Sequence, residues 1–398
     1  MNLADERFSS PSLRALLALA VVLVMLATTG WTALRHHKNG GDALAVATAA
    51  WRHGSVGGRP LPDPQAAPGL IARFFASVGP DRAKLLADRY PLIVGNLNGA
   101  PITLRYQANR RSLGTARAQE TARSHSSLLT AEGRRDAALR ADRYASLLGA
   151  GRRILAFDPT GRGRAAEVFG DLGTAERVSI VVPGVDTDVL SFEREEDPAR
   201  APVGMARSLY AAEHAAAPRT RTAVIAWADY TTPQGVGLDA STGELAEHGA
   251  VRLTALVRAL PARGRVSLFC HSYGSVLCGV AAPELPSGRV SDIAVFGSPG
   301  MRVDKAADLG TTARVWATRD STDWIGDVPH LEFAGVGHGA DPVSPAFGAR
   351  VVSSEAAQGH AGYFRPGTDS LANFTSIALG RYPDVRCAAG SDCRADVA

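Results

Sequence analysis

A short strand-like run that ends at a serine constrains this chain more than any other feature. Residues Val266 to Gly274 read VSLFCHSYG, so β-branched and aromatic residues lead directly into Ser272. This order is typical of a nucleophile elbow, the sharp strand-to-helix turn that lifts a serine hydroxyl above a parallel sheet. The glycine that usually opens the turn is replaced by Cys270. Ser272 is therefore the candidate nucleophile.

Strand-like and helix-like patterns alternate on both sides of this elbow. Besides the elbow strand itself, we expect strands at 154–158, 165–170, 178–182, 222–227, 290–296, 315–318 and 349–352. Most are separated by helical patterns, at 205–217, 241–260, 274–282 and 369–379. Buried-type strands alternating with helices predict a mostly parallel sheet with helices on both faces. A hairpin that leads into the pattern, and a serine after the fifth strand, match the order of the α/β-hydrolase fold.

Composition divides the chain into six parts. They are an N-terminal tail (1–14), a transmembrane helix or signal anchor (15–34), a Gly-, Pro- and Ala-rich linker (35–66), a helical N-terminal section (67–150), an α/β-hydrolase domain (151–383) and a flexible C-terminal tail (384–398). Within the helical section we expect helices at 67–76, 81–90 and 113–148. This section should pack on or cap the sheet that follows.

The segment Ala15 to Leu34 carries no charge and is about long enough to cross a bilayer. A basic cluster follows it, and its apolar run is longer than that of a typical signal peptide, so we favour an uncleaved membrane anchor. The expected protein is then single-pass in the cell membrane, with this helix contacting the lipid and an extracytoplasmic catalytic domain. Secretion after signal cleavage is the alternative.

Net charge indicates which kinds of partner are expected, and the cysteines bear on the cellular compartment. A formal charge of +4 over 398 residues does not argue for nucleic acid as a partner. The basic excess is concentrated between 101 and 153, where we expect solvated helix faces, or alternatively contact with an anionic lipid or cell-wall surface. Cys270 and Cys278 fit small buried positions near the elbow. Cys387 and Cys393 form either a disulfide, which would fit an oxidising exterior, or two free thiols.

A serine hydroxyl needs a base to take its proton and an acid to orient that base. In α/β-hydrolases the order along the chain is Ser, then Asp or Glu, then His. The loop after the strand at 315–318 offers Asp323 as the acid, with Asp320 as the alternative. His360 follows the last expected strand and is the candidate base, with His338 as its substitute.

The negative oxygen of the reaction intermediate must be met by backbone N–H groups. These usually come from the residue after the serine and from the loop after the third strand. The corresponding positions are Tyr273 and the turn Gly184–Val185. The Tyr273 N–H would also lie at the start of a helix, where the helix dipole favours negative charge. No metal and no organic cofactor is needed by such a site.

From Ala87 onward the chain resembles the actinobacterial α/β-hydrolase family long filed as a domain of unknown function. The matching stretches are ADRYPLIVGNLNGAP (87–101), YQANRR (106–111), ILAFDPTGRGRAAEVFGDL (154–172), VVPGVDTD (181–188), AWADYTTP (226–233), HSYGS (271–275), GSPG (297–300), GHGADP (337–342) and YF (363–364). The resemblance implies an α/β-hydrolase fold with a Ser, Asp and His triad. It also implies that the helical section belongs to the same module.

The resulting hypothesis is a serine hydrolase that cleaves an ester or related acyl bond through an acyl-enzyme on Ser272. Its substrate would be a small-molecule or lipid-like acyl compound. Two alternatives stay open. The same triad serves amidases and peptidases, and a membrane-tethered binding or cell-envelope protein could keep the fold without turnover.

Overall fold

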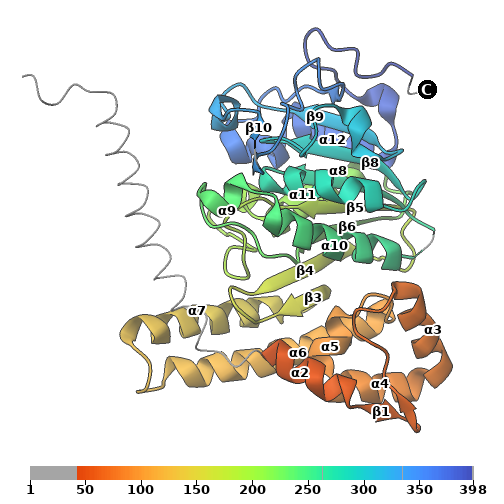
Figure 1. The fold of residues 1–398 in the computed structure, drawn as a ribbon, viewed down its shortest axis with the longest axis vertical. Coiled ribbons are helices and arrows are strands. Elements are labelled where there is room, and N and C mark those ends of the chain that lie inside the picture. Colours follow the sequence, from red (N-terminus) through yellow and green to blue (C-terminus); the bar gives the residue numbers. More distant parts are fainter. Residues whose placement is uncertain (1–42, 262, 334, 397–398) are drawn as a thin grey trace, which may run out of the picture.

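The computed structural model describes residues 43–261, 263–333 and 335–396. In these residues an eight-stranded sheet forms the centre of the molecule, and a bundle of helices stands at one end of that sheet (Figure 1). The predicted membrane segment at 15–34 lies outside the described residues. Within the described part, no helix is long and apolar enough to cross a bilayer.

The sheet has the strand order of an α/β-hydrolase. Its strands are β3 (Ile154–Asp158), β4 (Arg164–Gly170), β5 (Arg177–Val182), β6 (Thr222–Ala228), β7 (Arg265–His271), β8 (Val290–Phe296), β9 (Arg314–Thr318) and β12 (Arg350–Val351). They lie in the order β12-β9-β8-β7-β5-β6-β4-β3. Only the pairs β3–β4 and β4–β6 are antiparallel, so the sheet is mostly parallel, as predicted.

Helices cover both faces of this sheet. They are α8 (Pro202–Ala216), α9 (Leu238–Ser241), α10 (Glu244–Ala259), α11 (Tyr273–Ala281) and α12 (Asp369–Leu379). Successive residues of a strand point to opposite faces. Accordingly, Ile180 and Leu268 pack in the core that contains α10 and α11, whereas Val181 and Phe269 pack in the core that contains α8 and α12. Burial on both faces explains why the central strands read as continuous apolar runs.

The helical section precedes the sheet and packs against its edge. It contains α2 (Ala43–Arg52), the short strands β1 (Ser55–Val56) and β2 (Arg59–Pro60), α3 (Pro68–Val78), α4 (Pro80–Arg89), α5 (Pro91–Asn96), α6 (Ile102–Ser124) and α7 (Ala131–Leu147). The single helix expected at 113–148 is thus two helices. The second begins where the Thr130 side chain accepts a hydrogen bond from the N–H of Gly133.

Polar side chains of this section satisfy the outer edge of β3. The Asn96 side chain donates to the carbonyl of Phe157 (2.7 Å) and accepts from its N–H (2.9 Å). Asn109 donates to the carbonyl of Ile154, and the buried Arg105 donates to that of Leu155. These bonds replace a neighbouring strand, so the edge is not left open for pairing with another chain.

Two predicted boundaries are wrong. The linker expected at 35–66 is not a linker from residue 43 onward, because α2 and the β1–β2 hairpin occupy it. There Trp51 is fully buried, with its ring 5.4 Å from that of Tyr90. The tail expected to be flexible from 384 onward is attached to the sheet. Cys387 is bridged to Val352 beside β12, and a disulfide joins Cys387 to Cys393.

Candidate active site

Ser272 occupies the sharp turn between β7 and α11. Its φ of 53° is positive, which is uncommon for a residue with a side chain and is a feature of strained functional turns. Its N–H donates to the carbonyl of Phe296 on β8 (3.1 Å). A Cβ at Gly274 would lie only 2.5 Å from the carbonyl oxygen of Val182, so only glycine lets α11 approach β5 this closely. The strand-to-helix turn expected at this serine is present.

Asp323 and His360 meet at the carboxyl ends of neighbouring strands. Asp323 lies in the loop after β9, directly before the 3-10 turn η4 (Trp324–Asp327), and His360 lies in η5 (Gly359–Phe364) after β12. The Nδ1 atom of His360 is 2.8 Å from Oδ1 of Asp323. Because a carboxylate only accepts, His360 donates this bond and its Nε2 becomes the acceptor nitrogen. That Nε2 is buried and has no hydrogen-bond partner within the described part of the chain.

The Asp323 carboxylate is held by several donors. It accepts from the hydroxyl of Tyr363 (2.5 Å) and from the N–H of Ile325 (3.0 Å), in addition to His360. Burial by itself would raise the pKa of Asp323, but the hydrogen bonds from His360 and Tyr363 outweigh it and lower this pKa below its usual value. The carboxylate is therefore ionised near neutral pH and can stabilise a charged imidazole.

The two alternative residues have other partners. Asp320 accepts from the N–H of Gly359 (3.1 Å) and so supports the loop that carries His360. His338 binds the carbonyl of Ala240 through Nε2 (2.6 Å) and packs edge-on against Tyr273. Burial lowers the pKa of His338. Of the four acid and base candidates, the structure brings together Asp323 and His360.

His271, the residue before the nucleophile, connects the elbow to the base. Its Nε2 lies 2.6 Å from the carbonyl oxygen of His360, and the two imidazole rings are 4.6 Å apart. Burial lowers the pKa of His271 to about 3, so this ring is neutral and donates to that carbonyl. His271 thereby places His360 beside the serine turn.

The oxyanion candidates lie around the same serine. A Cβ at Gly184 would be 2.6 Å from the Cβ of Ser272 and 3.0 Å from its Oγ, so the loop after β5 lies against the nucleophile. Tyr273 is the first residue of α11. Among the described residues, the N–H groups of Val185 and Tyr273 donate to no other protein group. Both donors are thus free to bind a negative oxygen.

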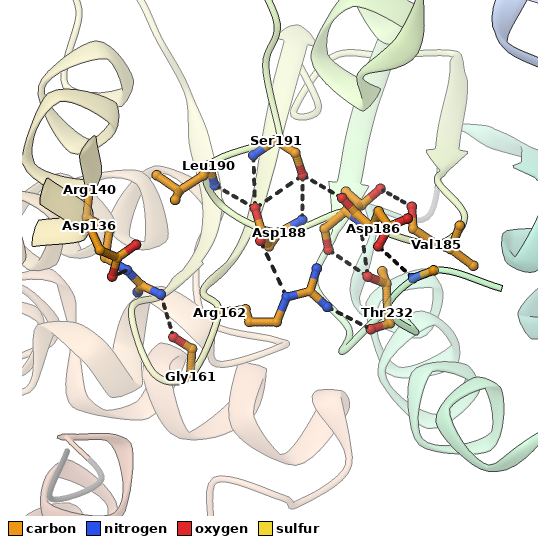
Figure 2. A network of polar contacts seen from close by, with 12 residues as sticks. Asp136, Arg140, Gly161, Arg162, Val185, Asp186, Asp188, Leu190, Ser191 and Thr232 are labelled. Carbon is orange, nitrogen blue, oxygen red and sulfur yellow. Dashed lines mark hydrogen bonds and ion pairs between the residues drawn. The ribbon is translucent and has the colours of Figure 1, made fainter. Parts of the chain in front are cut away.

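Figure 2 shows the polar network that holds this loop. The Asp188 carboxylate accepts from the backbone N–H groups of Leu190 and Ser191, both at 2.9 Å, which closes the loop on itself. Arg162, from the β3–β4 hairpin, donates both to Asp188 (3.4 Å) and to the carbonyl of Thr232 (3.1 Å). The loop is thereby fixed between the hairpin and the segment after β6.

Asp186 is a residue of this loop with a positive φ. Its φ is 57°, its N–H donates to the carbonyl of Pro233, and its carboxylate accepts from the N–H of Gly235. The roles of Arg162, Asp186 and Asp188 could not be predicted from chain order. They do lie inside the stretches GRGR and VDTD, which carry the family resemblance, and that was the available signal.

A cavity of about 710 Å³ opens beside the acid loop, lined by Asp320, Asp323 and Trp324 among others. Neither Ser272 nor His360 lines it, so we do not assign it to the substrate. Within the described residues, no group of three or more His, Cys, Asp or Glu side chains gathers as it would around a metal ion. We therefore assign no metal site.

The fold and this arrangement define the class: an α/β-hydrolase with a serine elbow. A family model described as alpha/beta hydrolase matches residues 158–333 of the chain. The resemblance inferred from the sequence is thereby confirmed.

Relatives and solved structures show how far the similarity extends. An uncharacterized protein of Mycobacterium tuberculosis is 26% identical over 384 residues, which is 80% of this chain and 57% of the relative. An uncharacterized protein of Mycobacterium bovis is 32% identical over 152 residues, or 37% of this chain and 56% of the relative. The chain thus spans little more than half the length of these relatives. Among solved structures, the 2,6-dihydroxy-pseudo-oxynicotine hydrolase is similar with a TM-score of 0.33 and 12% identity, covering 79% of this chain and 96% of that one.

Proposed function

We propose that the protein is a serine hydrolase that cleaves an ester or related acyl bond through an acyl-enzyme on Ser272. The observation that carries the proposal is the hydrogen bonding of the two ring nitrogens of His360. Its Nδ1–H is bound by Asp323, which leaves Nε2 as an unpartnered base next to the serine turn. A histidine oriented in this way is what a weakly nucleophilic hydroxyl requires.

The proposed reaction follows from these positions. The Oγ of Ser272 attacks the acyl carbon, and its proton moves to Nε2 of His360 while Asp323 stabilises the imidazolium. The oxygen of the tetrahedral intermediate binds the N–H groups of Tyr273 and Val185. The intermediate then expels the alcohol, which takes the proton from His360. Water repeats the sequence on the acyl-enzyme, releasing the acid and restoring the hydroxyl of Ser272.

Exposed apolar side chains support a substrate with an apolar acyl part. From residue 151 onward, the exposed large apolar side chains of the described chain are Val236, Leu238, Val251, Trp324, Leu331 and Val336. All except Val251 lie in the segments between β6 and α10 and between β9 and β12, which follow the carboxyl ends of β6 and β9. The Trp324 ring is 4.8 Å from that of His360. An apolar chain leaving the serine would find contacts on these loops.

The cysteines support an extracytoplasmic site of action. All four are paired, Cys270 with Cys278 and Cys387 with Cys393. Disulfides persist in oxidising compartments and are rare in the cytosol. We therefore retain the proposal of an exported catalytic domain, tethered to the membrane through the segment at 15–34.

A fluorophosphonate probe tests the nucleophile. The probe phosphorus bonds to the serine Oγ and fluoride leaves, so the wild type should be labelled and Ser272→Ala should not. His360→Ala and Asp323→Asn should be labelled more slowly. If the folded wild type is not labelled, the non-catalytic binding protein is favoured instead. Turnover of p-nitrophenyl esters of short and long acyl chains, compared with the matching anilides, then separates an esterase from an amidase or peptidase.

A further inference from the structure

A disulfide crosses the nucleophile elbow. It joins Cys270, the second-last residue of β7, to Cys278 in α11, eight positions later, with the Cα atoms 6.5 Å apart. Ser272 and Tyr273 lie inside the closed loop. Both cysteines are fully buried, and Cys270 is paired in the sheet with Val182 and Val295. The residue that replaces the expected glycine is thus one end of a covalent link between strand and helix.

The conformation inside this loop needs such support. The positive φ at Ser272 is strained and persists only where the surroundings hold the turn in place. Around the turn, the carbonyl of Ser272 accepts from the N–H of Ser275 (2.9 Å) and from its hydroxyl (2.5 Å). These bonds hold the start of α11, whereas the disulfide fixes the distance between its second turn and β7.

We propose that the Cys270–Cys278 disulfide is a positioning element of the active site, which sets the place of the Ser272 hydroxyl and the Tyr273 N–H relative to the oxyanion loop. This inference rests on the proposed hydrolase function. It implies that acylation is fast only in the oxidised protein, while the fold itself persists after reduction. The fold should persist because the disulfide links β7 and α11, which many other contacts already hold in place.

Reduction would change the elbow through simple packing. A dithiol supplies two electrons and two protons, the Sγ–Sγ bond breaks, two thiols form, and the dithiol becomes a cyclic disulfide. Bonded sulfurs lie about 2 Å apart, but unbonded heavy atoms prefer roughly 3.5–4.0 Å. Because both side chains are fully buried, α11 and β7 must separate at Cys278 and Cys270, or the two side chains must rotate. A displacement of about 1 Å at reacting groups can slow a reaction about 100-fold.

The second disulfide supplies a matched control. The variant Cys387→Ser/Cys393→Ser lacks the C-terminal bond and keeps the elbow bond, so its fluorophosphonate labelling rate should equal that of the wild type. Dithiothreitol treatment of this variant then acts on the elbow alone. Reduction is verified by the mass of two alkylated thiols and the fold by near-ultraviolet circular dichroism. The variant Cys270→Ala/Cys278→Ala shows the same site without the bond.

Three results are expected. Reduction should slow labelling about 10- to 100-fold while the circular dichroism is retained. Reoxidation should restore the rate. Hydrogen exchange should become faster at 271–281 and stay unchanged in α8 and α12. The Cys270→Ala/Cys278→Ala variant should be labelled slowly with or without the dithiol. If dithiothreitol cannot reach the buried disulfide, the labelling rate of this variant tests whether the bond positions the serine.

Other outcomes overturn the proposal. An unchanged labelling rate with two thiols present would mean that the bond does not position the serine. Loss of the circular dichroism together with labelling would make it a general stability element. If the oxidised protein is not labelled at all, the hydrolase function fails. The hydrogen exchange of 271–281 still tests the positioning, and no change there would refute it.

Discussion

Replacing Gly184 with alanine should damage the proposed reaction directly. Gly184 is not among the residues with positive φ, so alanine is allowed by the backbone. Its Cβ, however, would lie 2.6 Å from the Cβ of Ser272, 3.0 Å from Oγ and 3.1 Å from the carbonyl oxygen of His271. Contacts between heavy atoms prefer roughly 3.5–4.0 Å. The loop or the nucleophile must therefore move by about 1 Å.

Neither side can move freely. The loop is fixed by Asp188 and Arg162, and the elbow by the bonds of Ser272 and by the disulfide. Overpacking of this kind costs roughly 1–3 kcal/mol of stability. A displacement of about 1 Å lowers the rate about 100-fold. The second-order rate constant of fluorophosphonate labelling, measured beside thermal unfolding, reports both effects.

Gly114→Ala is the matched control. Gly114 lies on the exposed surface of α6, and a Cβ there would meet nothing within 4 Å. Alanine in a helix interior gains about 1 kcal/mol over glycine, so this variant should be somewhat more stable and be labelled at the wild-type rate. If Gly184→Ala keeps both the labelling rate and the unfolding temperature of the wild type, the loop does not face the nucleophile as argued.

Three further variants test the site and the core. Tyr363→Phe removes the hydroxyl bound to Asp323, so urea unfolding should show a loss of roughly 1.5–3 kcal/mol, the range for hydrogen bonds to charged groups, and the pKa of Asp323 should rise in a carboxyl NMR titration. His338→Ala should be labelled at close to the wild-type rate, and a loss as large as that of His360→Ala would instead make His338 the base. Burial raises the pKa of Glu213 from 4.5 to about 7. Between these pH values the folded state keeps a proton that the unfolded chain releases. The free energy of unfolding must therefore fall as pH rises from 4.5 to 7. The fall amounts to about 3 kcal/mol, and Glu213→Gln should lack it. Unfolding free energies of both proteins at pH 4 and pH 8 measure the difference. If the wild type and Glu213→Gln show the same pH dependence, the raised pKa of Glu213 is refuted.

Elements with a strong local signal could be predicted from the sequence. The strands at 154–158 and 290–296 and the helix at 369–379 have the predicted bounds, because buried strands and amphipathic helices carry their own periodicity. The break between α6 and α7 was missed because Ala- and Arg-rich segments on both sides favour helix equally. Thr130, whose side chain caps α7, is a local mark of the new start.

In the candidate site, too, some residues could be predicted from the sequence and others could not. Chain order sufficed to propose Asp323 and His360, because the fold fixes which strand precedes each of them. The link between Cys270 and Cys278 could not be predicted, because spacing does not reveal whether two Cβ atoms face each other. The Tyr363 contact was hidden for a related reason, since forty positions separate it from Asp323 and only packing brings them together.

The boundary expected at 150/151 falls within one packing unit. Strand β3 is the edge of the sheet, and three of its residues are hydrogen-bonded by Asn96, Asn109 and Arg105 from before that boundary. Burial lowers the pKa of Arg105 to about 10, because the charged guanidinium loses its contact with water. Such a loss is tolerated where the alternative is an open strand edge, which invites pairing with other chains. The helical section therefore packs as one unit with the sheet: it covers the β3 edge of the same sheet whose other strands lead to Ser272, Asp323 and His360.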